Sequence, residues 1–204
     1  MKKLVFLQFA VLLLILVLSG CAGHDPRLTS TTTQYLTPGG QIAERKSGGI
    51  VDTVSYWDGD GVAGSPSVTI DLRQQQARFY KGGRLVGVSL VSSGREGYST
   101  PSGNFKIMQK SKNHVSNLYG DYVDAAGNVV VANVGVKSDP MPPGARFRGA
   151  PMPYFMRITS SGVGMHAGFL PGFPASHGCI RMPEHMAEVF FANVAQGTPV
   201  RVIN

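Results

Sequence analysis

From Ser65 to the C-terminus, short runs rich in β-branched and aromatic residues alternate with turn residues at close spacing. This pattern predicts a mostly β domain built largely from antiparallel strands. Hydrophobic residues make up 43% of the 204 residues, enough for the core of one domain. A pair of glycines at Gly82 and Gly83 supplies the positive φ angles of a tight hairpin. The predicted strands are Val68–Leu72, Ala77–Tyr80, Leu85–Val91, Phe105–Met108, Val129–Val134, Tyr154–Ile158 and Val200–Ile203.

One segment has the periodicity of a helix. Between Pro183 and Val194, apolar residues such as Met186 and Phe190 recur at spacings that place them on one helical face. Proline suits a first helical turn, and Gly197 suits a stop. We therefore expect one amphipathic helix on a β-rich body.

The N-terminus has the layout of an export signal. Lys2 and Lys3 precede an apolar run from Leu4 to Leu18, which is short for a membrane span of about 20 residues. The run is followed by Ser19, Gly20 and Cys21, which together resemble the lipobox of bacterial lipoproteins.

This resemblance implies that Cys21 is lipidated and anchors the protein to a membrane. An uncleaved anchor helix with an incidental cysteine is the alternative, and both interpretations export the domain. In lipoproteins the residue after the cysteine influences sorting, and Ala22 favours the outer membrane and so a periplasmic location.

Three regions are expected along the chain. Residues 1–20 form the signal peptide, residues 21–64 the lipidated N-terminus and a flexible tether, and residues 65–204 the catalytic domain. The tether assignment rests on a composition of Thr, Ser, Gly, Gln and Pro up to about Gly49. Residues 50–64 are compatible with either an edge strand or a loop packed on the domain.

The formal net charge of +7 is compatible with several partners. An exported protein rarely meets nucleic acid, so no nucleic-acid partner is expected, and anionic lipids or wall polymers are better candidates. The basic residues are scattered, so charge that serves general solubility explains the same balance.

A single cysteine remains for chemistry once Cys21 is lipidated. Cys179 then has no internal disulfide partner in a compartment where disulfides form, so it is either a buried inert thiol or a reactive one. The stretch Gly164–Met182 also contains His166 and His177. A cysteine attacks a carbonyl as the thiolate, and an imidazole can withdraw its proton and return it to a leaving amine.

The residues of this stretch resemble the active-site signature of the L,D-transpeptidase catalytic domain, also called the YkuD domain. That signature is a histidine, here His166, followed by Ser-His-Gly-Cys, here Ser176 to Cys179. Two upstream segments, Val91–Gly94 and Thr100–Phe105, resemble further family segments, so the likeness covers Ser65–Asn204. It implies an L,D-transpeptidase-type β-sandwich or barrel-like domain with one or two helices near the active site.

Carried over by position, the resemblance implies that Cys179 is the acylated nucleophile and His166 its general base. The backbone carbonyl of Ala167, where glycine is commoner, would orient the imidazole. The other signature positions would line the site, position the substrate or support the oxyanion, and they are Ser176, His177, Gly178 and Arg181.

The reaction that the resemblance implies begins on peptidoglycan stem peptides. Cys179 attacks the carbonyl at the L-centre of the third residue of a tetrapeptide stem, typically meso-diaminopimelate, and D-alanine leaves. An amine then resolves the thioester, giving a 3→3 cross-link or attachment of a wall protein. An exported cysteine carboxypeptidase or amidase on wall peptides and a non-catalytic wall-binding lipoprotein are the alternatives.

A zinc site would use overlapping residues. Imidazole and thiolate are the ligands that zinc prefers, and His166, His177, Cys179 and His185 could supply them. The paired-cysteine motif of many zinc sites is missing, so we expect neither metal nor organic cofactor. His114 is expected to be solvated.

The segment from Gln109 to Pro153 matches the family pattern least well. It is polar at first and rich in proline from Pro140 onward. We expect it to be a variable lid over the cleft, where substrate choice would be made.

Overall fold

The structure is a computed structural model and describes residues 52–204. The predicted signal peptide, Cys21 and the tether up to residue 51 lie outside this range. Within residues 52–204, no helix is both long and apolar enough to cross a membrane.

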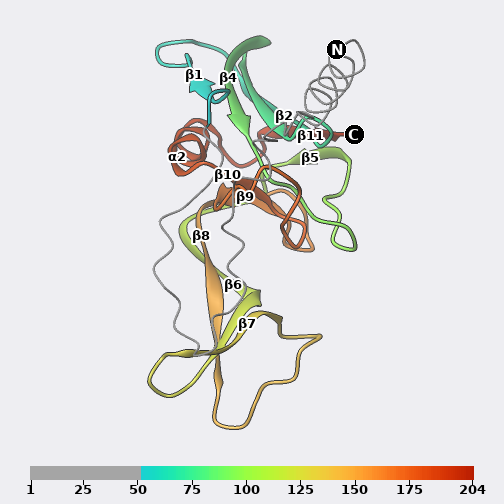
Figure 1. The fold of residues 1–204 in the computed structure, drawn as a ribbon. Coiled ribbons are helices and arrows are strands. Elements are labelled where there is room, and N and C mark those ends of the chain that lie inside the picture. The colour runs from blue at the N-terminus through green and yellow to red at the C-terminus, as the bar shows by residue number, and fades with distance from the viewer. Residues whose placement is uncertain (1–51) are drawn as a thin grey trace, which may run out of the picture. The chain divides into compact units, whose positions relative to one another are not determined.

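Two β-sheets form the body of the protein (Figure 1). The first has six strands in the order β1-β4-β3-β2-β11-β5 and is antiparallel except for the β11–β2 pair. Its strands are β1 (Tyr56–Trp57), β2 (Pro66–Asp71), β3 (Gln76–Lys81), β4 (Arg84–Leu90), β5 (Gly103–Lys106) and β11 (Pro199–Ile203).

The second sheet has five strands in the order β10-β9-β8-β6-β7, and only its β10–β9 pair is parallel. Its strands are β6 (Gln109–Val123), β7 (Val129–Gly135), β8 (Arg146–Arg157), β9 (Gly164–Ala167) and β10 (Ile180–Met182).

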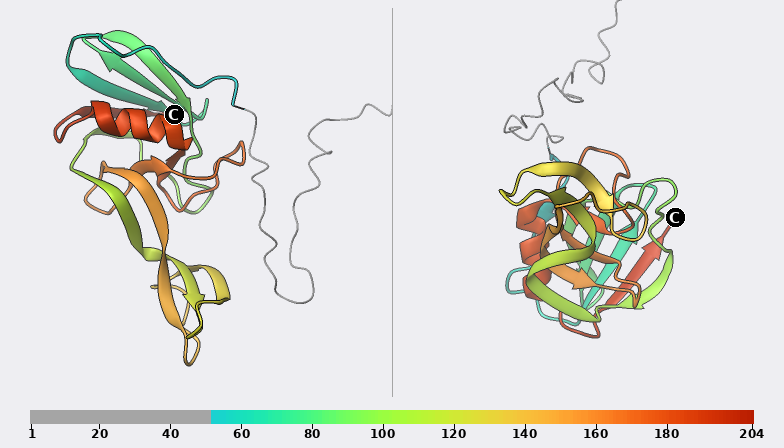
Figure 2. Two further views of the ribbon diagram at one scale, coloured as in Figure 1. Left: turned by 90° about the vertical axis from the view of Figure 1, so that its left-hand side faces the viewer. Right: turned by 90° about the horizontal axis from the view of Figure 1, so that it is seen from below.

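The core lies between the two sheets and includes the helix α2 (Glu184–Asn193). Met186, Ala187 and Phe190 of α2 are buried, and the Phe190 ring meets Phe79 of β3 edge-on at 5.0 Å between centroids. Figure 2 shows α2 alongside the six-stranded sheet. The mostly β fold class with a helix near the active site is confirmed, and Pro183 occupies the N-cap position of α2.

The segment ahead of Ser65 packs on this body as an edge strand, which decides between the two possibilities that the sequence left open. β1 pairs antiparallel with β4, with Trp57 opposite Gly87. The Trp57 ring meets Phe79 edge-on at 5.1 Å, and its Nε1 donates to Asp60 Oδ1 at 2.9 Å. A Cβ on Gly87 would lie 2.7 Å from the indole, so glycine leaves the space that Trp57 fills.

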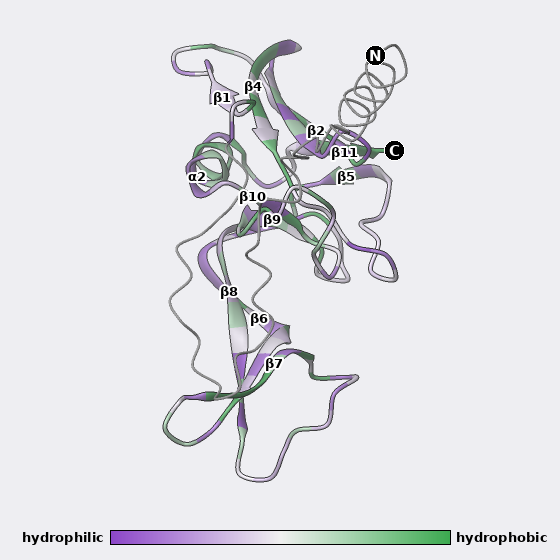
Figure 3. Ribbon diagram, viewed as in Figure 1, coloured by the Kyte–Doolittle hydropathy of each residue, from purple (hydrophilic) through white to green (hydrophobic). Residues whose placement is uncertain are grey.

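An arm made of residues 109–153 leaves the sandwich as β6, β7 and the first part of β8 (Figure 1). Figure 3 shows how hydrophilic much of β6 is. The register between β6 and β8 jumps between Val115 and Gly120, so Ser116–Tyr119 bulge out of the ladder. Gly149 lies under this bulge, where a Cβ would come 1.9 Å from Ser116 O.

Candidate active site

Cys179 lies in a loop directly before β10, and it is half-buried. The Sγ atom lies 3.8 Å from the carbonyl oxygen of Gly162, which belongs to the turn between β8 and β9. The thiol therefore faces a backbone oxygen in the resting structure.

His166 lies on β9, the strand that pairs with β10, and only 7% of its surface is exposed. Arg181 on β10 is directly opposite it in the register. The Nδ1 atom of His166 lies 2.7 Å from the carbonyl oxygen of Ala167. A carbonyl only accepts, so Nδ1 carries the proton and Nε2 keeps a free lone pair.

Burial keeps both reactive groups neutral. It lowers the pKa of His166 to about 4, against the opposing effect of the Ala167 hydrogen bond. Burial also raises the pKa of the Cys179 thiol, although a backbone hydrogen bond with Gly164 and the charges of Arg181 and Arg157 oppose this. Among residues 52–204, no hydrogen bond joins Sγ to either imidazole, as is common before a substrate tightens a site.

The loop that carries Cys179 is held by its own side chains and by an upstream segment. Ser176 Oγ donates to the carbonyl oxygen of Cys179 and accepts from the amide of Gly178 at 3.0 Å. Thr100 Oγ1 donates to the carbonyl oxygen of Gly178 at 2.8 Å and accepts from the amide of Gly94 at 2.9 Å. The φ of Gly178 is +109°, a conformation that side chains rarely adopt.

His177 lies in a cage of three side chains. Tyr119 stacks on its imidazole at 4.4 Å between centroids and 16° between planes, and Tyr98 meets it edge-on at 4.7 Å. An Arg95 nitrogen lies 2.9 Å from Nε2, and since the guanidinium only donates, Nε2 accepts. Burial, followed by the charges of Arg95 and Arg181, lowers the pKa of His177.

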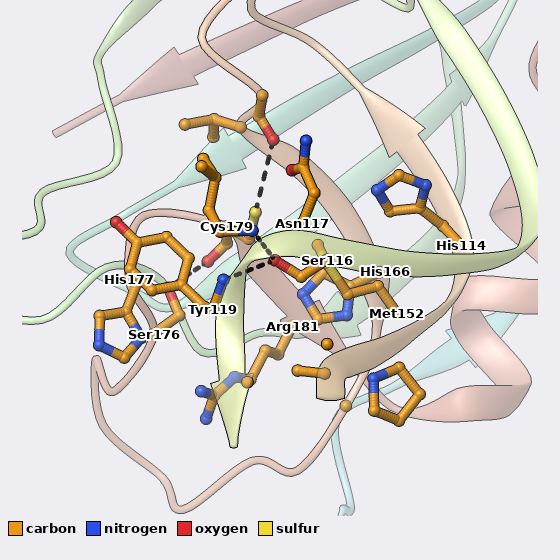
Figure 4. A pocket seen from close by; sticks show the side chains of 18 of the residues that line it. His114, Ser116, Asn117, Tyr119, Met152, His166, Ser176, His177, Cys179 and Arg181 are labelled. Atoms are coloured by element: carbon orange, nitrogen blue, oxygen red, sulfur yellow. Dashed lines mark hydrogen bonds between the residues drawn. The ribbon is translucent and has the colours of Figure 1, made fainter. Parts of the chain in front are cut away.

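One cavity of about 1060 Å³ connects these groups. Figure 4 shows Cys179, His166 and Arg181 around the same hollow. Of the expected site residues, those that line it are His166, Ala167, Ser176, His177, Cys179 and Arg181. Gly178 supports the loop without lining the cavity.

Several residues of the cavity were not singled out in the sequence, although the segment from Gln109 to Pro153 was expected to lie over the cleft. The arm contributes the Ser116–Tyr119 bulge and His114, which was expected to be solvated. His114 is instead half-buried and stacks on Phe155 at 4.3 Å between centroids. Arg157 at the end of β8 also lines the cavity. The signal for the arm was Tyr119 in a polar stretch of the sequence, and a lone aromatic residue does not specify a partner.

The alternative zinc site is not assembled. In the part of the chain that the structure describes, no three His, Cys, Asp or Glu side chains come close enough to hold a metal ion. His185 projects from α2 and is exposed, whereas His166 is buried on β9.

Comparison with known families supports this geometry. Residues 65–202 match the model of the YkuD family, described as the L,D-transpeptidase catalytic domain. The chain belongs to this family. Its members are cysteine-dependent acyltransferases that act on the stem peptides of peptidoglycan, outside the cytoplasm. The sequence matches none of the curated proteins searched.

Solved L,D-transpeptidase structures share the fold. The enzyme from Mycobacterium smegmatis is 19% identical with a TM-score of 0.53, and the match covers 69% of this chain and 59% of that one. L,D-transpeptidase 3 from Mycobacterium tuberculosis, in complex with a faropenem-derived adduct, is 22% identical with a TM-score of 0.52. That match covers 69% of this chain and 60% of the other. The Enterococcus faecium enzyme is 25% identical with a TM-score of 0.50, and the match covers 69% of this chain and 50% of that one. The match thus spans between half and three-fifths of these relatives.

Proposed function

We propose that this protein is a peptidoglycan L,D-transpeptidase with Cys179 as nucleophile and His166 as general base. The observation that carries the proposal is the 2.7 Å contact between His166 Nδ1 and the carbonyl oxygen of Ala167. The Nδ1–H of His166 is held by Ala167 O, so the lone pair of Nε2 is free to accept a proton beside the loop of Cys179.

In the first half-reaction the Cys179 thiol attacks the carbonyl carbon at the L-centre of the third stem residue. The thiol proton passes to His166 Nε2 as the carbon–sulfur bond forms. The bond to the terminal D-alanine nitrogen then breaks, and His166 returns the proton to that nitrogen. A thioester and free D-alanine are the products.

In the second half-reaction an acceptor amine attacks the thioester carbon. His166 Nε2 takes a proton from this amine and returns it to the departing sulfur, which regenerates the neutral pair. The acceptor is a second stem peptide, giving a 3→3 cross-link, or an amine of a wall-attached protein.

The neighbouring residues prepare these steps. Because the Gly178 amide already donates to Ser176 Oγ, the amide of Cys179 is the better candidate to stabilise the developing oxyanion. Arg181 packs over Gly168 and lines the cavity, where its charge favours the thiolate. His177 accepts from Arg95 and shapes the wall beside the nucleophile.

The N-terminal residues complete the proposal. Cys21 after the apolar run would carry lipid, and residues 22–51 would tether the domain to the membrane. The domain would then act in the periplasm, anchored at the outer membrane.

The test is to incubate the purified full-length protein with disaccharide-tetrapeptide and to follow the products by mass spectrometry. A dimer that has lost one D-alanine is expected, and it should be absent from Cys179→Ala and His166→Ala. Tripeptide alone would support the alternative carboxypeptidase. Unchanged wall binding by Cys179→Ala, without any release of D-alanine by the wild type, would support a binding lipoprotein.

A further inference from the structure

Arg157 is a charged cavity residue to which the proposed reaction gives no role. It ends β8, where its carbonyl oxygen accepts from Met108 N at 2.8 Å and its register partner is Gly164. The side chain is half-buried and lines the cavity. Its backbone is thus fixed on both sides, and its charge lies close enough to affect the Cys179 thiol.

Among residues 52–204, the guanidinium of Arg157 has no hydrogen-bond or ion-pair partner. Its Nε is buried without a hydrogen-bond acceptor, and among residues 52–204 the side chain makes no ion pair or hydrogen bond. That nitrogen is too buried to meet a ligand, so a bound acceptor would pair with the terminal N–H groups of the same guanidinium. By contrast, Arg148 in the same cavity donates to Asp121 Oδ2 and Gly127 O.

The charges that line the cavity do not balance. Its lining contains Arg148, Arg157 and Arg181 but only one carboxylate, Asp121. That carboxylate is already occupied by Arg148 at 3.2 Å and by the amide of Asn133 at 3.1 Å. Two arginines near Cys179 therefore remain uncompensated, and a cleft with such walls attracts anions.

We propose that Arg157 is a binding subsite for a carboxylate of the stem peptide. The planar guanidinium matches a carboxylate, which can accept two parallel hydrogen bonds from it. The inference rests on the proposed function for its ligand. The stem offers two such groups, the terminal carboxylate of D-alanine and the side-chain carboxylate of the diamino acid at position three.

The experiment compares three tetrapeptide substrates: one with both carboxylates free, one ending in D-alaninamide, and one amidated on the third residue's side chain. KM and kcat are measured from release of the C-terminal residue, D-alanine or D-alaninamide, by the wild type, Arg157→Gln and the exposed control Arg201→Gln. Calorimetry measures the Kd of each peptide in a Cys179→Ala background, which does not depend on turnover.

With both carboxylates free, Arg157→Gln should raise KM and Kd about 10- to 100-fold, the effect of one or two charge-assisted hydrogen bonds. The kcat should change little, and Arg201→Gln should behave as the wild type. Amidating the carboxylate that Arg157 contacts should weaken wild-type binding by a similar factor, and Arg157→Gln should then add nothing. The amidated peptide on which Arg157→Gln no longer changes KM and Kd identifies which of the two carboxylates Arg157 binds.

Equal binding of all three peptides by the wild-type site would overturn the subsite without any mutation. Equal losses on all three peptides in a folded Arg157→Gln variant would also overturn it. Carboxylate-dependent binding to Cys179→Ala without release of D-alanine by the wild type would refute the transpeptidase and keep the subsite. If the peptides neither bind nor release D-alanine, both the transpeptidase function and the Arg157 subsite are overturned.

Discussion

Tyr119 of the arm stacks on His177 of the nucleophile loop at 4.4 Å between ring centroids and 16° between ring planes (Figure 4). The two residues are far apart in sequence, and the contact links the least family-like segment of the chain to the most family-like one. Residues 109–153 were expected to form a lid over the cleft, and this contact and the cavity lining place part of the segment beside the nucleophile loop.

Replacing Tyr119 with alanine should therefore reduce catalysis without unfolding the domain. An aromatic pair contributes about 0.5–1.5 kcal/mol, so kcat/KM should fall roughly two- to tenfold as His177 loses its position. Tyr119→Phe keeps the ring and should retain nearly full activity. Steady-state kinetics on a tetrapeptide tests both, and equal losses in the two variants would mean that the hydroxyl matters instead.

Gly149 and Gly168 provide a matched pair for testing how the cavity is built. A Cβ at Gly149 would lie 1.9 Å from the backbone oxygen of Ser116, whereas a Cβ at Gly168 would first meet Arg181 Cγ at 3.1 Å. The backbone of Ser116 cannot move away from an added methyl group as easily as the flexible side chain of Arg181 can. Gly149→Ala should lower the free energy of unfolding by about 1–3 kcal/mol, and Gly168→Ala by less.

Chemical denaturation measures the loss of stability in each variant, and kcat/KM measures the effect on catalysis. Gly168→Ala should weaken substrate use through displacement of Arg181 while its unfolding curve stays close to the wild type. A larger loss of stability in Gly168→Ala than in Gly149→Ala would contradict the arrangement of the bulge.

The sequence predicted β2, β3, β4, β5, β7, β11 and the end of β8 because runs of β-branched and aromatic residues between turn residues mark them. The Gly82-Gly83 hairpin has φ values of +56° and +82°, as expected for a tight turn. The prediction missed β6, β9, β10 and the first part of β8. Pro151 and Pro153 argue against a central strand. They are accommodated because β9 pairs only with Met156 and Arg157 of β8, so this stretch of β8 has a single neighbour, β6.

The site was predictable only where chemistry fixes the residue types. His166, Ser176, His177 and Cys179 stand in a short ordered motif, and the structure brings all four to one cavity. Arg157 and Tyr119 were missed because their position depends on strand register, which a single sequence does not reveal.

Trp57 should stabilise the folded unit although it precedes the boundary predicted at Ser65. Its ring packs on Phe79 and lies near Phe190. Trp57→Ala should reduce the free energy of unfolding by about 2–3 kcal/mol, at the lower end for a large aromatic because the ring is half-buried. A chain that begins at Ser65 should lose at least as much relative to one that begins at residue 52. Equal denaturation midpoints would contradict this role.

The alkylation rate of Cys179 should report a neutral thiol at physiological pH. Burial raises the pKa of this thiol, so its thiolate fraction should grow about tenfold per pH unit from pH 6 to 8. In a Cys21→Ser background, the rate constant with iodoacetamide should follow that slope without a plateau. His166→Ala should leave the slope unchanged. A neutral plateau that disappears in His166→Ala would instead reveal a resting thiolate–imidazolium pair.

The buried neutral His166 should also make the protein sensitive to acid. In the unfolded chain its pKa returns to about 6.5, whereas in the fold it is about 4. Above pH 6.5 both states are neutral and the group has no effect on stability. As the pH falls from 6.5 to 4, the unfolded state binds a proton that the folded state does not. The free energy of unfolding should therefore fall by about 3 kcal/mol from this residue. His166→Asn lacks the titration, so urea denaturation at pH 7 and pH 4 should show a smaller acid loss in the variant, while equal losses would mean that His166 accepts its proton inside the fold.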